Sequence, residues 1–356
     1  MFSFNRGVSS KDKVLFYESI ANLLDGGVTL LAAFKGFASR LPAGKLRDAV
    51  ENTIFFVESG DQLNTAMRKL PDFYSEKEIA IIESGEQTGM LKDTFNAIAK
   101  ELRNNEELKS KVIGALTYPM VIVFFLILAL VIVMVYVIPQ LMPVIIEMAT
   151  EIPWTTKSLM ATSDFFRNNF ALIVGVFIAA ALIFRGYVMT DSGKMWFDRF
   201  KIYNIVSGKA YKNYLIVQVM ATFHLLSSSG VGIVKALRLT GASSGNVYMA
   251  SVYHSIADAV SSGRKISEAM QELDKDMYIF TPDIVQLIES AEKTSTVHQV
   301  TFKISEQYRR ELDAVIATMV KLIEPVALLG AGVFVMWFAL AIFSVVMQIT
   351  QSAGIN

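Results

Sequence analysis

The residues best placed to do chemistry are two pairs of glutamates in matching strings. Glu83 and Glu86 belong to IESGEQT, and Glu289 and Glu292 belong to IESAEKT. In each pair the two carboxylates are three residues apart, so they share one face of a helix or flank a turn. Such a pair could bind a divalent cation or contact lysines and arginines of a partner protein. Nothing in the spacing suggests catalysis.

The same strings also fit a purely structural role, in which a helix ends and is followed by a cap. In the first copy Gly85 and Gly89 permit the turn that such an ending needs. The second copy has Ala291 and Ser295 at these places, so the two copies need not do the same job. Both interpretations of the carboxylates stay open at this point.

Other catalytic and ligand-binding patterns are missing from the sequence. The chain has no cysteine, which excludes disulfides, thiolate nucleophiles and Cys-ligated metal centres. His224, His254 and His298 lack metal-ligand spacing, and no phosphate-binding loop of the Walker type occurs. The 33 basic and 33 acidic residues cancel, which argues against nucleic acid as a partner. We therefore expect no enzyme activity, no metal and no cofactor.

The elements that carry the glutamates belong to an apolar chain. Of its 356 residues 53% are hydrophobic, and its mean hydropathy is +0.43. Residues 121–138 and 326–349 each predict a transmembrane helix, because about 20 apolar residues span the hydrocarbon core. Residues 170–184 are fewer and predict a third span only if Arg185 extends to the interface. The alternative for this middle stretch is a buried soluble helix.

Lysines and arginines near the span ends predict the orientation, because such residues gather on the cytoplasmic side. They lie before the first and third spans and after the second. The loop after the first span has no basic residue before Lys157, and none follows the third span. The residues concerned are Arg103, Lys109, Lys111, Arg185, Lys194, Arg199, Lys201, Arg309, Arg310 and Lys321. We expect a cytoplasmic N-terminus and a periplasmic C-terminus.

The two soluble segments are copies of each other. VESGDQLNTAM at residues 57–67 aligns with VSSGRKISEAM at residues 260–270, and the two glutamate strings follow in the same order. Pro119 then aligns with Pro325, and each proline stands where its chain segment enters the membrane. Several blocks in one order indicate an internal duplication. Each repeat is thus a soluble domain that ends in a membrane helix.

Within a copy the hydrophobic pattern is helical throughout. Apolar residues recur at helical spacing, turns follow at glycines and prolines, and Ser75 with Glu78 forms a capping-box pattern. The helices predicted for the first copy cover residues 13–24, 28–38, 45–57, 62–70 and 75–83, and a last one starts at about Met90. The predicted fold is an all-α membrane protein with two homologous cytoplasmic six-helix bundles and three transmembrane helices.

These patterns divide the chain into seven predicted segments. The first cytoplasmic repeat is expected at 1–118 and the second at 190–323. Transmembrane helices are expected at 119–139, 169–189 and 324–350, with a periplasmic loop at 140–168 and a periplasmic tail at 351–356.

Three functional classes fit a chain of this kind, namely an interaction scaffold, a small transporter or channel, and a membrane-anchored enzyme. A transport path normally shows ionisable residues or broken helices at mid-depth, and Arg185 and Glu324 instead lie at span ends. Gly330 and Gly332 would allow close helix contact and hence a homo-oligomer, and simple packing against lipid is the alternative for them. The spans therefore favour anchors for a scaffold over a conduit.

The order of the elements resembles the inner-membrane platform proteins of type II secretion and type IV pilus assembly, the shorter bundle-type pilus members in particular. The likeness covers almost the whole chain, from about residue 13 to residue 349. Its elements are Gly27 with Val28, Gly230 with Val231, Ser59 with Gly60, Ser262 with Gly263, Gly85 with Glu86 and Gly89, and the prolines Pro119 and Pro325.

The resemblance implies a non-enzymatic scaffold in the bacterial inner membrane. Its partners would be a hexameric assembly ATPase, companion inner-membrane assembly proteins, pilin or pseudopilin subunits, membrane lipids and further copies of the chain. The platform would pass the subunits into the growing fibre. Longer members of the family have an extended segment before the first helix that is nearly absent here, so no ATPase contact through such a segment is expected.

Overall fold

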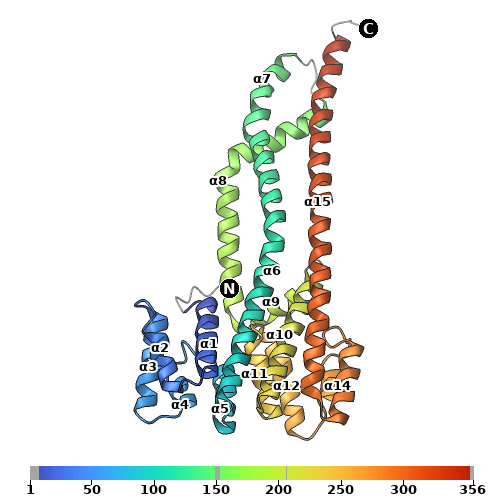
Figure 1. Ribbon diagram of the computed structural model, residues 1–356. Coiled ribbons are helices and arrows are strands. Elements are labelled where there is room, and N and C mark those ends of the chain that lie inside the picture. Colours follow the sequence, from blue (N-terminus) through green and yellow to red (C-terminus); the bar gives the residue numbers. More distant parts are fainter. Residues whose placement is uncertain (1–7, 149–152, 206, 353–356) are drawn as a thin grey trace. The chain divides into compact units, whose positions relative to one another are not determined.

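The described part of the chain folds into helices joined by short connections (Figure 1). A computed structural model describes residues 8–148, 153–205 and 207–352, and these contain helices and no strand. The helices before the second span are α1 (Ser10–Asp25), α2 (Leu30–Ala38), α3 (Lys45–Glu58), α4 (Leu63–Arg68), α5 (Glu76–Thr88), α6 (Leu91–Ile132), the π-helix η1 (Val133–Val137) and α7 (Ile138–Met148). They are followed by α8 (Trp154–Met189), α9 (Asp191–Tyr203), α10 (Gly208–Ser228), α11 (Ile233–Ser243), α12 (Val247–Ser261), α13 (Ile266–Leu273), α14 (Pro282–Thr294) and α15 (Val297–Ser352).

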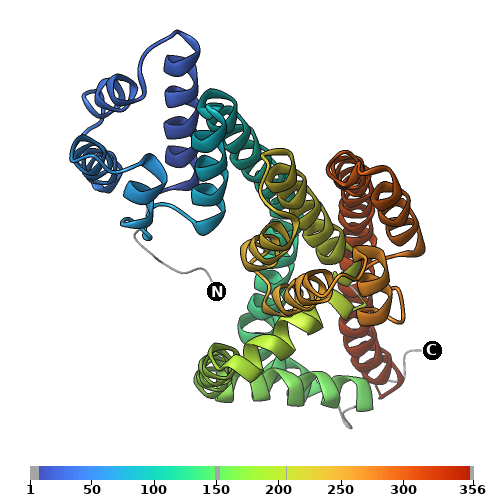
Figure 2. The ribbon, with the colours of Figure 1, turned by 90° about the horizontal axis from the view of Figure 1, so that it is seen from below.

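The six helices expected in each repeat are confirmed. The first repeat consists of α1 to α5 with the start of α6, and the second of α10 to α14 with the start of α15. Figure 2 shows the short helices of the two repeats, blue and yellow to orange, gathered in separate bundles. Helix α5 begins at the predicted capping box, in which Ser75 and Glu78 bond each other's backbone N–H groups.

One boundary was wrong. Helix α5 does not stop at Glu83 but runs to Thr88, and Gly89 ends it with the left-handed φ of 72°. The backbone keeps its helical hydrogen bonds through the glutamate string, Gly85 included, because the residue that adopts a positive φ is Gly89, which follows the string. Glu83 and Glu86 therefore lie within the helix, one turn apart.

By its contacts the chain divides into two compact units. The first comprises Met1–Lys111 with Met195–Ala314, and so contains both repeats. In the first repeat the core is aromatic: the buried Phe16 ring packs edge-on against Phe34, Phe37 and Phe73. Such edge-to-face pairs add about 0.5–1.5 kcal/mol each to the burial of the rings.

The two repeats differ in one buried pair at the base of the first helix. In the first repeat Lys13 on α1 donates to Glu78 on α5 at 2.9 Å, and the Glu78 side chain is only 2% exposed. The aligned residues of the second repeat are Ile216 and Ile284, both buried. An ion pair in one copy is thus replaced by two buried apolar residues in the other, a swap that costs little when both partners change together.

The second compact unit comprises Val112–Lys194 with Val315–Asn356 and contains the three apolar stretches. Its core is formed by Met134, Ile138, Leu159 and Ala341. Hydroxyl groups on α8 bond backbone carbonyls of the neighbouring helices: Ser163 donates to Met134 O and Thr156 to Ala341 O, both at 2.6 Å. The first of these carbonyls lies in the π-helical turn η1, where regular helix bonding is disturbed.

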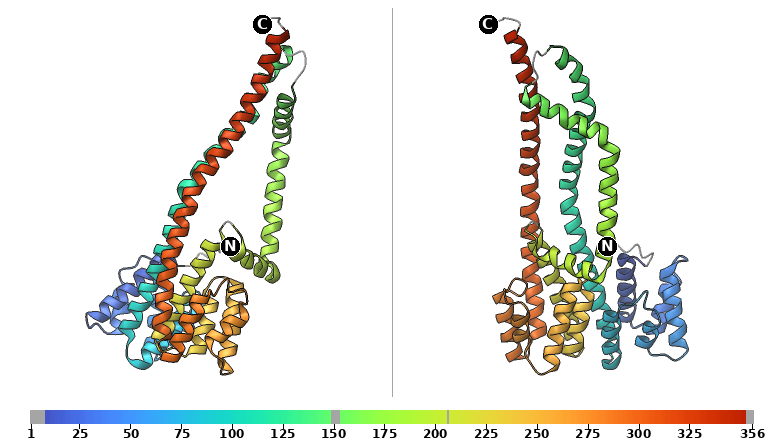
Figure 3. Two further views of the ribbon diagram at one scale, coloured as in Figure 1. Left: turned by 90° about the vertical axis from the view of Figure 1, so that its right-hand side faces the viewer. Right: turned by 180° about the vertical axis from the view of Figure 1, so that it is seen from behind.

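Between the first two spans the described residues are largely helical. Helix α7 continues to Met148 and α8 already begins at Trp154, so most of the stretch 140–168 lies in helices. Figure 3 shows α8 changing direction along its length, with its first part crossing towards α15. The hydroxyl bonds from Thr156 and Ser163 explain why this polar stretch packs as a helix.

Candidate interaction site on the repeated helices

The second glutamate of the first string caps a helix that is distant in sequence. Glu86 on α5 accepts hydrogen bonds from Leu63 N at 2.6 Å and from Asn64 N at 3.0 Å, and Asn64 Nδ2 adds a third at 2.6 Å. These two amides open α4, whose own N-cap residue, Gln62, offers no side-chain acceptor. The carboxylate therefore satisfies amides that would otherwise lack partners and places negative charge at the positive end of the helix dipole.

The second repeat reproduces this arrangement. Glu292 on α14 accepts from Ile266 N, from Ser267 N at 3.3 Å and from Ser267 Oγ at 2.6 Å, at the start of α13. The N-cap of α13 is Lys265, which again supplies no side-chain cap. The glutamate shared by both strings has one structural task in both repeats, the capping of the fourth helix from the fifth.

The first glutamate of each string has a different task in each repeat. Glu83 pairs with Arg68 at 3.1 Å and also with Lys235 on α11 of the second repeat at 2.8 Å. The hydrogen bond from Lys235, with the charges of both cations, lowers the pKa of the Glu83 carboxyl. Glu289 instead pairs within its own helix, with Lys293 at 2.6 Å, and its side chain is 45% exposed.

Around Glu83 the two repeats meet directly. Ser84 Oγ on α5 donates to the carbonyl of Ser229, just before the turn at Gly230. A Cβ atom on Gly230 would lie 3.1 Å from that hydroxyl oxygen, and φ at Gly230 is 81°, so the close approach requires glycine. A groove of about 160 Å³ opens beside the contact, lined on one side by α5 and on the other by the residues from Gly230 to Lys235.

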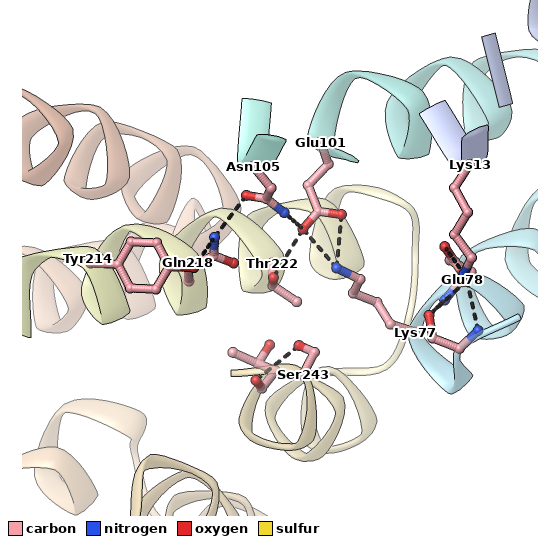
Figure 4. Close-up of polar contacts among 11 residues, drawn as sticks. Lys13, Lys77, Glu78, Glu101, Asn105, Tyr214, Gln218, Thr222 and Ser243 are labelled. Atoms are coloured by element: carbon pink, nitrogen blue, oxygen red, sulfur yellow. Dashed lines mark hydrogen bonds and ion pairs between the residues drawn. The ribbon is translucent and has the colours of Figure 1, made fainter. Parts of the chain in front are cut away.

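A buried polar network forms a second link between the repeats (Figure 4). Lys77 on α5 pairs with Glu101 on α6 at 2.8 Å, and the two side chains are 12% and 7% exposed. Glu101 Oε1 also accepts from Thr222 Oγ1 on α10 at 3.2 Å and from Asn105. Gln218 on α10 donates to Asn105 Oδ1 at 3.2 Å.

Sequence reasoning missed this network. Lys77 and Glu101 are ordinary helix residues in the sequence, and only the fold brings them together. The one available signal is the comparison between copies, because the aligned residues are Asp283 and Gln307 and the pair has no counterpart.

Cation binding by the paired glutamates has no matching geometry in the described residues. Within 8–148, 153–205 and 207–352 no three acidic or histidine side chains converge on one point. Both oxygens of Glu86 and of Glu292 already accept N–H groups, and Glu83 is held by two cationic side chains. The arrangement serves helix capping and the contact between the repeats.

The glycines of the first string serve packing and chain reversal. A Cβ atom on Gly85 would lie 2.1 Å from Thr94 Oγ1, so α5 and α6 approach closely only because no side chain is present. Gly89 has φ 72°, and its counterpart Ser295 adopts φ 57° at the end of α14. The turn is therefore kept in the second repeat without a glycine.

The family comparison matches both halves of this architecture. A family model described as "Type II secretion system (T2SS), protein F" matches residues 16–139 and again residues 220–345. The chain belongs to this family. The two matches confirm the duplication and take in both glutamate strings as well as Pro119 and Pro325.

Individual members of the T2SS protein F family resemble the chain over nearly its full length. The type IV pilus assembly protein PilC of Thermus thermophilus is 26% identical over 333 residues, which cover 94% of this chain and 81% of that protein. PilC of Myxococcus xanthus is 25% identical over 337 residues, covering 95% and 80%. The type II secretion system protein F of Pseudomonas aeruginosa is 22% identical over 352 residues, covering 99% and 86%.

The two prolines that align between the repeats lie inside continuous helices. Pro119 is within α6 and Pro325 within α15, and both helices run on past the proline for more than three turns. Each repeat of this T2SS protein F family member is thus joined to its apolar stretch by one unbroken helix.

Proposed function

We propose that the chain is the inner-membrane platform of a type IV pilus or type II secretion machine, a scaffold rather than an enzyme. It would link a cytoplasmic hexameric assembly ATPase to the insertion of pilin or pseudopilin subunits into the fibre. The family membership and the names of the relatives support this role.

The observation that carries the proposal is the continuity of α6 and α15. They have 42 and 56 residues and pass from the two repeats into the apolar stretches without a break. At 1.5 Å per residue they are about 60 and 85 Å long, rods well suited to transmit a displacement. Because Thr222 and Lys235 of the second repeat bond Glu101 and Glu83 of the first, a force on either repeat would reach both rods.

The basic residues near the span ends also give the proposed orientation of the chain in the membrane. Both repeats and the N-terminus would be cytoplasmic and the C-terminus periplasmic, with spans at 119–139, 169–189 and 324–350. The cysteine-free chain allows a direct test with single cysteines and an impermeant maleimide. In intact spheroplasts a cysteine at the exposed Ala161 should react, because this residue would be periplasmic. Glu58→Cys in the first repeat should react only after lysis.

The partner-binding part of the proposal concerns the carboxylates and the spans. Glu289 is more exposed than Glu83, the matching glutamate of the first string, so it is the one placed to meet cationic groups of the ATPase or a companion protein. Gly330 and Gly332 have nothing within 4 Å of a built Cβ atom, which leaves room for the helix of a second copy.

The test uses the full chain in nanodiscs with the purified cognate ATPase. We expect co-purification of the two proteins, weakened by Glu289→Lys. The matched control is Glu272→Lys, which reverses another exposed glutamate of the second repeat, one that lies on α13 and pairs with Arg264. Failure of the unmodified chain to bind either the ATPase or the companion membrane proteins would overturn the proposal.

A further inference from the structure

We propose that α9 is an interfacial helix whose aromatic face lies in the lipid headgroup layer and anchors the second repeat to the bilayer. This helix precedes the six helices of the second repeat and has no counterpart among the described residues of the first. The inference rests on α8 being a membrane span and does not depend on the platform role.

One face of α9 exposes aromatic rings. Trp196, Phe200 and Tyr203 follow one another at helical spacing and are 52%, 51% and 38% exposed. The Trp196 and Phe200 rings stack at a centroid distance of 5.6 Å with an interplanar angle of 10°. Trp and Tyr are enriched at membrane–water interfaces, where one part of the ring is apolar and the other is hydrated.

The opposite face of α9 is fixed to the second repeat. Asp198 is 3% exposed, and its carboxylate accepts from Val247 N at 2.7 Å at the start of α12. The Asp198 carbonyl accepts from Asn246 Nδ2 at 3.1 Å, and the carbonyl of the buried Ile202 accepts from Tyr278 OH at 3.2 Å. With this face held, the helix cannot rotate its aromatic rings into the protein core.

The chain connection brings α9 to the membrane surface. The apolar stretch of α8 ends at Phe184, Arg185 follows, and α9 begins six residues later at Asp191. At 1.5 Å per residue this distance is about 9 Å. The headgroup layer on each side of a bilayer is about 5–8 Å thick, so α9 starts close to the outer edge of this layer.

At this junction the chain turns instead of extending the axis of α8. Thr190 is extended, with ψ 152°, and its hydroxyl accepts from Gly193 N at 3.1 Å. A Cβ atom on Gly193 would lie 2.0 Å from the carbonyl oxygen of Tyr187, so the corner closes tightly only with glycine there. Because α8 and α9 are separate helices, α9 can lie along the surface, as proposed.

A positive charge beside the aromatic rings fits a lipid phosphate. Arg199 is exposed, and its guanidinium lies over the Tyr203 and Tyr248 rings at 5.6 and 5.5 Å. Cations next to an aromatic face are typical of interfacial helices. They favour a bilayer, rather than an apolar groove of another protein, as the partner that covers the aromatic face of α9.

Depth-dependent quenching of Trp196 tests the placement. The chain has three tryptophans, so Trp154→Phe with Trp337→Phe leaves Trp196 as the single fluorophore. In nanodiscs we expect lipids brominated near the headgroup to quench it about twofold more than lipids brominated near the chain end, with little quenching by aqueous acrylamide. The control is Phe55→Trp in a chain with all three tryptophans replaced, because Phe55 is 63% exposed in the first repeat. It should respond to acrylamide and not to brominated lipid.

Two results would overturn the proposal. One is Trp196 fluorescence that is quenched by acrylamide and not by brominated lipid, which would mean that a protein partner covers the aromatic face. The other is equal lipid quenching at position 55. Should the tryptophan variants fail to fold, a nitroxide on Ser192→Cys gives a second readout, since this residue is exposed next to the aromatic face. Its collisions with oxygen should exceed those with a water-soluble nickel complex, and the reverse would contradict the placement.

Discussion

The carboxylate of Glu101 in the first repeat accepts a hydrogen bond from the hydroxyl of Thr222 in the second, at 3.2 Å. The same carboxylate pairs with Lys77, so one buried group joins three helices from two repeats. A polar group in such a place has to keep all its partners, because leaving it unpaired costs more than the bonds themselves contribute.

Removing one partner of this buried pair should destabilise the chain strongly. We expect Lys77→Met to lower the free energy of unfolding by about 3–5 kcal/mol, since it leaves the Glu101 charge buried without its cation. Lys77→Met combined with Glu101→Leu should recover most of this loss. Denaturant titration of the detergent-solubilised chain measures both, and a double variant as unstable as the single one would contradict the assignment.

The remote caps predict a difference between neighbouring glutamates of one string. Glu292→Gln should cost about 1–2 kcal/mol, because amides at the start of α13 lose a charged acceptor. Glu289→Gln is the matched control and should leave the unfolding midpoint unchanged, as its side chain is exposed. Glu86→Gln should repeat the effect in the first repeat. A midpoint raised by calcium in the unmodified chain but not in the Glu86→Gln or Glu292→Gln variants would instead support cation binding.

Gly85 and Gly36 should respond in opposite directions to alanine. A helical Gly→Ala change gains about 0.5–1 kcal/mol where there is space, and Gly36 in α2 has nothing within 4 Å of a built Cβ atom. At Gly85 the new methyl group meets Thr94, and we expect a net loss of about 1–3 kcal/mol from overpacking. Adding Thr94→Ala should restore part of it. The unfolding temperatures of Gly36→Ala, Gly85→Ala and the double variant Gly85→Ala with Thr94→Ala test these expectations. A Gly85→Ala variant more stable than the unmodified chain would rule out the close contact.

His224 should make the stability of the second repeat depend on pH. Burial lowers the pKa of its imidazole. The hydrogen bond between Nδ1 and the His298 carbonyl oxygen, at 2.6 Å, opposes this in part, and the electrostatic effect of His298 and Lys100 lowers the pKa further. The folded chain therefore binds the proton less readily than the unfolded chain, so the contribution is complete above the ordinary histidine pKa of about 6.5 and is lost as the pH falls towards the lowered value. We expect unfolding midpoints to fall between about pH 6.5 and 5, and His224→Gln to flatten this slope. An unchanged slope would exclude His224 as its source.

The repeats were predictable because their signals are local. Capping residues, glycines and helical periodicity determine where α1 to α6 begin and end, and the end of α5 differed, since Gly89 and not Gly85 breaks that helix. The capping role of Glu86 could also have been predicted from the sequence. Gln62 and Lys265 are poor N-cap residues, which indicates that the fourth helix of each repeat takes its cap from elsewhere.

The contacts between the repeats could not be predicted from the sequence. The partners of Glu83 and Glu101 in the second repeat lie more than a hundred residues away, and no local pattern connects Lys235 or Thr222 to them. The start of α8 was missed for a similar reason. Its threonines and serines read as a loop until Thr156 and Ser163 are seen to bond carbonyls of neighbouring helices.

The most direct measurement of the platform role counts extracellular fibres on cells that lack this chain. We expect none in the deletion strain, restoration by the unmodified chain, and little restoration by Lys77→Met, which breaks the buried link between the repeats. Fibres at unmodified numbers and lengths in the deletion strain would contradict the role of this chain as the assembly platform.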